Sequence, residues 1–265
     1  MCQLLVLPAP LPSSEVSLGQ LVTDPLHVEF ASLKPSTAPS HKEKTFQAKY
    51  EDTVAHDQYG RFTSTRFVSK ISGQPHYSHE NLLMLAAEKM SFHAIDKPSS
   101  VFNTLRRDTT TRSFLCTMAA QKKPVYFVTG IQTLHKPSFK RAVVQHGVVA
   151  EASNSLFRPP VRRVDSASSI ASTVDKDSQE SVLAVELLKV KCRVGSRSEP
   201  HCIEDLDYNW SYHPMEGDLQ LSIGLGKPLE ASEMRSLGGF ESEDLYEDGS
   251  NESWTSGDED GIGGF

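Results

Sequence analysis

Hydrophobic and charged residues alternate most regularly over residues 181–194. From position 188 to position 194, an aliphatic or thiol side chain alternates with Lys or Arg at every step. Successive side chains of a β-strand point to opposite faces, so the pattern predicts a strand with one apolar face and one solvated face. It is typical both of a half-buried strand in an ordinary sheet and of a strand that lines a membrane pore. The alternation alone leaves both alternatives open.

Strands are also expected at four shorter segments. Residues 110–119 and 124–133 are rich in Val, Phe, Thr and Tyr, which favour strands. The Gln-Lys-Lys sequence between these two segments would form a basic turn. Residues 139–145 and 220–225 carry similar apolar runs. We therefore expect most of the chain's regular structure to be extended.

Three helices are predicted from capping residues and helical spacing. Ser78 would cap the first, because five apolar residues between positions 82 and 90 recur on one helical face. Pro98 would open a short helix over residues 99–105. A proline also opens the segment 228–237, which two glycines end, so we expect the third helix there.

Composition divides the chain into one domain and a tail. Of the 265 residues, 38% are hydrophobic, which is enough for one core, and we place the domain at residues 1–240. Within it, residues 1–45 would form one or two strands and a connection, and the Ser-rich segment 147–180 a flexible loop. Residues 241–265 contain nine acidic residues and no Lys or Arg, so this tail is expected to be disordered.

Basic residues are concentrated between positions 101 and 147, where Asp108 is the one acidic residue. Such an excess would attract acidic phospholipids, at about 1 kcal/mol per cation near the surface. A solvated face with no special partner is the alternative. Nucleic acid is not expected as a partner, since no zinc finger, RNA-recognition signature or basic helix is present. The candidate lipid-binding residues are Arg106, Arg107, Arg112, Lys122, Lys123, Lys136, Lys140 and Arg141.

No enzymatic chemistry is predicted. The sequence has no GxSxG, P-loop or HExxH motif, and we expect no catalytic residue and no cofactor. The four cysteines lack CxxC spacing, which is typical of reduced thiols. His201-Cys202 near Cys192 lacks two further metal ligands, so no metal is expected. With no signal peptide and no apolar stretch of roughly 18 residues, the chain is expected in the cytoplasm when inactive.

Two segments resemble strands of the gasdermin pore-forming domain. They are residues 125–133, followed by a variable connection over 134–141, and residues 182–192, which follow the long loop. The short fungal gasdermin-like regulators of cell death, which act in allorecognition and heterokaryon incompatibility, resemble the chain most closely. The resemblance implies an α+β fold, a twisted antiparallel sheet with surrounding helices, that can refold into a membrane β-barrel.

The resemblance also implies a function and a set of membrane-inserting residues. Such proteins bind acidic phospholipids, assemble as homo-oligomers or with an allelic or paralogous variant, and insert β-hairpins into the plasma membrane. The result is lytic, pyroptosis-like cell death. The segments 110–133 and 181–194 would supply the hairpins, since a spanning strand needs about 9–11 residues. The inserting side chains would include Val125, Phe127, Leu188, Val190 and Val194.

The chain departs from many gasdermins in having an acidic tail in place of a large inhibitory domain. That tail could cover the basic residues and so inhibit the domain, or it could simply increase solubility. Cleavage near Phe240 and acylation of Cys2 are two candidate modifications; the alternatives are an ordinary helix end and a packed thiol. A peripheral adaptor that docks on acidic membranes or partner proteins without inserting is the alternative function.

Overall fold

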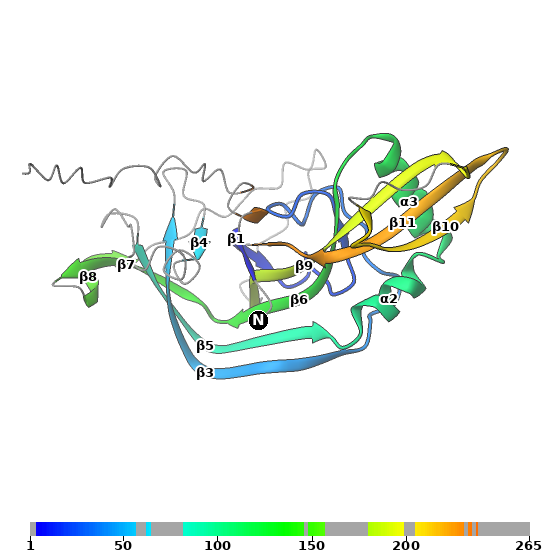
Figure 1. Cartoon of the computed structure of the whole chain (residues 1–265). Helices are drawn as coiled ribbons and strands as arrows, with labels where there is room; N and C mark the ends of the chain where they lie inside the picture. The colour runs from blue at the N-terminus through cyan, green and yellow to red at the C-terminus, as the bar shows by residue number, and fades with distance from the viewer. Residues whose placement is uncertain are drawn as a thin grey trace, which may run out of the picture.

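One curved antiparallel sheet dominates the computed structural model (Figure 1). The structure describes residues 4–56, 62–64, 82–145, 148–156, 180–198, 205–230, 233, 234 and 237. Within these residues, eleven strands join one sheet and two helices pack beside it. The strands are β1 (Leu5–Pro12), β2 (Leu21–Val22), β3 (His41–His56), β4 (Phe62–Ser64), β5 (Leu82–Ile95), β6 (Val125–His135), β7 (Ser138–Gln145), β8 (Val148–Leu156), β9 (Glu180–Ser196), β10 (Asn209–Pro214) and β11 (Leu219–Pro228); the helices are α2 (Pro98–Leu105) and α3 (Thr109–Ala120).

Strand β9 lies near the middle of the sheet and is hydrogen-bonded on both edges. The strand order is β10-β11-β9-β6-β5-β3-β4. One edge of β9 pairs with β6, with Val190 opposite Val125 and Leu188 opposite Phe127. The other edge pairs with β1 beside its first half and with β11 beside its second half. The segment with the strongest alternation is thus a central strand.

Strands β3 and β5 form a long ribbon that arches away from the rest of the sheet (Figure 1). The expected helix over residues 82–90 is wrong, because this segment lies in β5. Along β5, Leu85 and Ala87 are buried while Met84 and Ala86 are half-buried, which is the period of a strand. The other edge of β5 pairs with β6 and β7. Pairing on both edges overrides the helical propensity of Leu, Ala and Met here.

Helix α3 occupies residues that sequence patterns assign to a strand. Asp108 caps its N-terminus by accepting a hydrogen bond of 2.9 Å from the backbone N–H of Thr111. Thr111, Leu115 and Met118 are buried at helical spacing. The strand expected at residues 110–119 is therefore wrong, and the basic turn joins a helix to β6 instead of joining two strands. The hairpin proposed over residues 110–133 concerns the membrane-inserted form; in this fold the first of its two segments is helical.

The main core lies between the helices and the sheet. Phe102 of α2 and Phe127 of β6 are fully buried, and their rings meet edge to face with centroids 5.2 Å apart. Leu187 and Val190 of β9 and Ile223 of β11 belong to the same cluster. A second, smaller cluster between β3, β5, β6 and β7 includes Tyr50, Leu85, Leu134 and Phe139.

Several other expectations are confirmed: the strands at 124–133, 139–145, 181–194 and 220–225, and the helix at 99–105. The antiparallel sheet with a few helices is confirmed as well. The loop expected at 147–180 is wrong at its start, where β8 pairs with β7. In the third expected helix, Glu233, Met234 and Leu237 are helical, although β11 extends to Pro228. Cys2, Phe240 and the tail lie outside the described residues.

Candidate functional site

The two halves of β9 differ in their surroundings. Residues 182–187 are buried whichever way they point. From Leu188 onward the environments alternate: Val190 is buried, whereas Lys191 and Arg193 are exposed. Leu188, Cys192 and Val194 pack against the main core. The second half therefore has the apolar face and the cationic face that its sequence predicts.

Aromatic residues of β10 lie across β11 from these cations. In the register, Lys191 lies opposite Gly224 of β11, which lies opposite Trp210 of β10. A Cβ atom at Gly224 would come within 3.1 Å of the Trp210 ring. The ring can pack over β11 here because Gly224 has no side chain. The Nζ atom of Lys191 lies 5.8 Å from the ring centroid of Tyr208, within cation–π range. This surface thus combines cations with aromatic rings.

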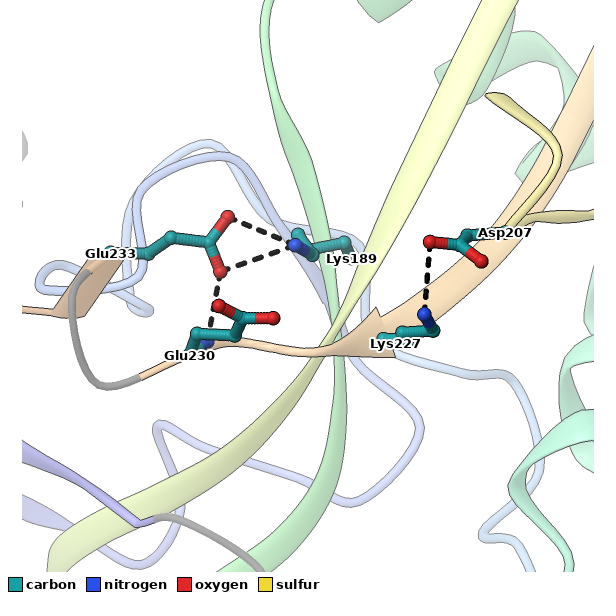
Figure 2. Close-up of polar contacts among 5 residues, drawn as sticks. All are labelled: Lys189, Asp207, Lys227, Glu230 and Glu233. Carbon is teal, nitrogen blue, oxygen red and sulfur yellow. Dashed lines mark hydrogen bonds and ion pairs between the residues drawn. The ribbon is translucent and has the colours of Figure 1, made fainter. Parts of the chain in front are cut away.

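Carboxylates pair with two of the cations on this face of β9, and Figure 2 shows one of the pairs, Lys189 with Glu233. Lys189 forms an ion pair of 2.9 Å with Glu233, and Lys191 pairs with Asp205. On the adjacent β11, Lys227 lies 2.9 Å from Asp207. We call Asp205, Asp207 and Glu233 the acidic cluster. Asp205 and Asp207 lie in the segment before β10, and Glu233 lies in the segment after β11. The negative charge therefore comes from segments outside the strands.

The Lys189–Glu233 pair shifts both pKa values in the direction of mutual stabilisation. Burial alone would raise the pKa of Glu233, but the backbone N–H of Glu230, which donates at 2.8 Å, and the ammonium of Lys189 lower it overall. Burial alone would lower the pKa of Lys189, but the hydrogen bond and charge of Glu233 raise it overall. Both groups therefore hold their charged forms more firmly than they would in water.

The segment that carries Glu233 is also attached to β9 by other contacts. The backbone N–H of Leu229 donates to the carbonyl of Leu187 at 3.2 Å. Leu229 and Met234 are buried in the main core. An ion pair, a backbone hydrogen bond and apolar packing thus hold this segment against the strand.

The predicted lipid-binding residues do not form a single patch. Arg107, Lys122 and Lys123 are exposed at the two ends of α3. Lys136 lies just before β7 and Lys140 within it, and Figure 1 shows β7 well away from α3. Lys136 forms an ion pair of 3.0 Å with Glu88 of β5. The side chain of Arg141 lies outside those that the structure describes.

Arg106 and Arg112 point inward. The Arg106 guanidinium donates from Nη1 to the carbonyls of Asn209 at 3.1 Å and Ile223 at 3.4 Å. Burial, followed by the charge of Arg107, lowers the pKa of Arg106. Arg106 therefore has a structural role: its hydrogen bonds connect the end of α2 to the β10–β11 pair. Arg112 is half-buried beside a groove between α3 and β10.

The predicted membrane-inserting residues lie together in the sheet. Val125 and Phe127 of β6 face Val190 and Leu188 of β9 in the register, and Val194 follows further along β9. In this conformation they are core residues: Phe127 is fully buried, and Val125 and Val190 nearly so. They reach lipid only if the main core opens.

Sequence analysis missed the acidic cluster and the strand β10. Asp205, Asp207 and Glu233 are separated in sequence from the lysines that they contact, and no motif connects them. The alternation of Trp210 and Tyr212 with smaller polar residues is a signal that could have revealed β10.

Two further features are absent from the described residues. In this part of the chain, no helix is long and apolar enough to cross a membrane. Likewise, no three His, Cys, Asp or Glu side chains among the described residues are grouped so that they could hold a metal ion.

Comparisons with known proteins give distant structural similarity and no match in sequence. No protein-family model matches the chain. No curated protein matches its sequence. Among solved structures, the chain is similar to a bacterial gasdermin from Bradyrhizobium tropiciagri, with 11% sequence identity and a TM-score of 0.26. The match covers 71% of this chain and 82% of that one.

Proposed function

We propose that the chain is a pore-forming protein that binds acidic phospholipids, oligomerises and inserts β-hairpins into a membrane. The observation that carries the proposal is the β6–β9 pair. These strands of 11 and 17 residues are adjacent and antiparallel, with aliphatic and aromatic residues in register. Each has at least the roughly 9–11 residues that a spanning strand requires.

The physical demand on an inserted strand favours this pair. In hydrocarbon every backbone N–H and C=O must be paired, which strands achieve in a closed barrel. Lipid-facing and lumen-facing side chains must also alternate. The second half of β9 has that alternation, with aliphatic residues at Val190 and Val194 and cations at Lys191 and Arg193. Inserted, the aliphatic residues would contact lipid and the cations water.

The acidic cluster would keep the chain in its resting form. Asp205 and Glu233 occupy the cations that an acidic phospholipid would otherwise contact. Phosphate headgroups and these carboxylates compete for the same ammonium groups. Release of the segment carrying Glu233 would therefore both uncover Lys189 and open the core at Leu229 and Met234.

The cellular role follows as part of the same proposal. The chain is cytoplasmic when inactive and acts at the plasma membrane, as a homo-oligomer or with an allelic or paralogous variant. Lysis then produces regulated cell death, as in fungal allorecognition. Inhibition by the tail, cleavage near Phe240 and acylation of Cys2 are the candidate controls.

Dye release from liposomes tests the proposal directly. We expect the full chain, or a form that ends at Phe240, to release dye from vesicles that contain acidic phospholipid and not from neutral ones. More release by the shorter form would make the tail inhibitory. If neither form releases dye from acidic vesicles, alone or with an allelic variant, pore formation is wrong.

A charge exchange tests the role of the acidic cluster. Glu233→Lys would place two cations together, loosen the segment and increase release. The double variant Lys189→Glu/Glu233→Lys restores an opposite-charge pair and should return release toward the original level. If the single and double variants release dye equally, the ion pair has no part in control.

One observation favours the alternative of a peripheral adaptor. Tyr212 and Leu219 are exposed near the β10–β11 turn, and Trp210 lies on the same face as Tyr212. Trp and Tyr are enriched at the membrane–water interface, and nearby cations favour acidic lipid. Such a surface could dock without insertion. Vesicle binding without dye release in every form of the chain would support this function.

A further inference from the structure

A groove lies between α3 and the β10–β11 pair, on the face of β10 opposite Trp210 and Tyr212. Its volume is about 560 Å³. Along α3 it is lined by Thr109, Arg112 and Ser113, and from the sheet by His213, Met215 and Leu221. The groove therefore has a polar end near the start of α3, and beyond it the lining mixes Thr117 and Gln121 with apolar residues.

Arg112 has an unused hydrogen-bond donor at this groove. Its Nε atom is buried and has no hydrogen-bond partner among the described residues. Leaving a donor of a charged group unsatisfied costs free energy, because the water that solvated it has been removed. Such a cost is offset when a ligand supplies the acceptor.

The electrostatics of the groove favour an anion. The pKa of His213 is lowered, first by burial and then by the positive charges of Arg112 and Arg106. Of the described side chains that line the groove, none is a carboxylate. His213 interacts with the hydroxyl of Ser211 at 3.2 Å, which orients its ring. Positive charge from Arg112 and Arg106 therefore acts on this place, while Asp108, the carboxylate before Thr109, is engaged as the cap of α3 by the N–H of Thr111.

We propose that this groove binds a phosphate group, with the guanidinium of Arg112 as its anchor and His213 and the hydroxyls of Thr109 and Ser113 as further donors. A phosphate has more acceptor oxygens than a carboxylate, which matches a guanidinium, an imidazole and two hydroxyls around one hollow. Met215 and Leu221 would lie beside the ester-linked carbon chain. The phosphate belongs either to a soluble phosphomonoester or to a lipid headgroup.

Binding of glycerol 3-phosphate by the full chain tests the site without a membrane. We expect Arg112→Gln to weaken binding at least about tenfold, since a charge-assisted hydrogen bond is lost. Lys97→Gln is the matched control, because it removes one positive charge from an exposed position before α2, outside the groove lining, and should leave binding unchanged. Equal binding by the original chain and both variants would overturn the proposal, as would no binding at all.

A spectroscopic readout keeps the test valid if Arg112→Gln folds poorly. In the original chain, the Nε–H resonance of Arg112 should shift when glycerol 3-phosphate is added, and His213→Gln should reduce the affinity while preserving that shift. A resonance that does not move at saturating ligand contradicts the proposal.

Vesicles separate the two sources of phosphate. If the ligand is a lipid headgroup, vesicles with phosphatidic acid should bind more tightly than phosphatidylserine vesicles of equal surface charge, and Arg112→Gln should abolish the difference. If the ligand is soluble, the two vesicles bind alike while glycerol 3-phosphate still binds in solution. Both results support the site. Because the solution arm needs no membrane, it can succeed where dye release fails.

Discussion

At the residue scale, Lys122 shows how a single position ends α3. It has a left-handed backbone with φ of 55°. Its N–H donates to the carbonyl of Ala119 at 3.1 Å, and that of Lys123 donates to Met118 at 3.0 Å. This is the hydrogen-bond pattern of a helix end that usually contains glycine. The basic turn is therefore a helix cap built with a strained residue.

Lys122→Gly should stabilise the protein. Glycine adopts a positive φ without the steric cost that a side chain incurs, so we expect a gain of about 1 kcal/mol in the free energy of unfolding. Lys123→Gly, one position later, is the control and should give no gain. Chemical denaturation of both variants provides the measurement, and a loss of stability in Lys122→Gly would contradict the interpretation.

Arg106→Gln should destabilise the fold, although the sequence alone groups Arg106 with the surface cations. The substitution leaves the carbonyls of Asn209 and Ile223 without their donor in a buried place. We expect a loss of about 2–4 kcal/mol. Arg107→Gln should change stability by less than about 0.5 kcal/mol. Thermal or urea unfolding of the pair would show the difference, and similar losses would remove the structural role of Arg106.

Gly130→Ala should also destabilise, because a side chain has no room there. A Cβ atom would come within 2.7 Å of the Phe92 ring and 2.9 Å of the Glu186 carboxylate. Overpacking of this kind typically costs about 1–3 kcal/mol. The second substitution Phe92→Leu should recover part of the loss in the double variant. If the two losses simply add, the steric explanation fails.

At the element scale, the sequence predicts a segment correctly where hydrophobic periodicity is the one strong signal. The prediction fails where capping or strand pairing opposes the local propensity. The alternation over β9 and the Val-rich run of β6 identify central strands correctly. The threonines at the start of α3 suggest a strand, but Asp108 and the turn at Lys122 make a helix. In β5 the opposite occurs, because neighbouring strands override helix-forming residues. Pairing between distant segments is invisible to local patterns.

The candidate site was predictable to a similar, partial extent. Periodicity locates the cations of β9, since their spacing is local. It cannot locate Glu233, whose contact with Lys189 depends on how the chain returns after β11. Nor does it distinguish Arg106, which bonds backbone carbonyls, from Arg107, which is exposed. A sequence shows which residues are charged, but the groups that they contact depend on the three-dimensional fold.

The contact between Glu233 and β9 should depend on pH. The pKa of Glu233 is lowered in the fold, so its contribution is present above the ordinary carboxyl value of 4.5 and is lost as the pH falls through the lowered pKa. Because its side chain is 38% exposed, solvent screening keeps the effect small.

Comparison with Glu233→Gln isolates this contribution. The variant should be less stable than the original chain at neutral pH, and the difference should shrink as the pH falls and vanish at a pH low enough to protonate Glu233 in the fold. Unfolding in urea at a series of pH values gives the comparison. A difference that stays constant down to that pH would show that the carboxylate charge is irrelevant.

At the scale of the whole molecule, the sheet behaves as one unit because β9 joins its parts. β9 is hydrogen-bonded to β6 on one edge and to β1 and β11 on the other. Removing β9 would separate β6 from β1 and β11 and would open the main core. Membrane insertion of this strand therefore requires opening on the scale of the entire domain, unlike the movement of a surface loop.

Amide hydrogen exchange should reveal this organisation. We expect the amides of residues 182–190 to exchange slowest, by global unfolding, and those of the exposed outer part of β3 to exchange much faster. Exchange measured by NMR or mass spectrometry at neutral pH tests the order. Fast exchange in β9 would mean that the strand detaches without unfolding the rest.

The pairing of β1 with β9 also governs how the chain is made. Leu5 lies opposite Val185, so β1 has no partner strand in the sheet until β9 has been translated. Apolar strands that wait for distant partners are exposed to aggregation. Pairs that do not involve β9, such as β3–β5 and β5–β6, can form earlier, whereas β1 must wait for β9. A shortened transcript that stops before β9 would yield a chain for chaperones and proteases, not a membrane-active fragment.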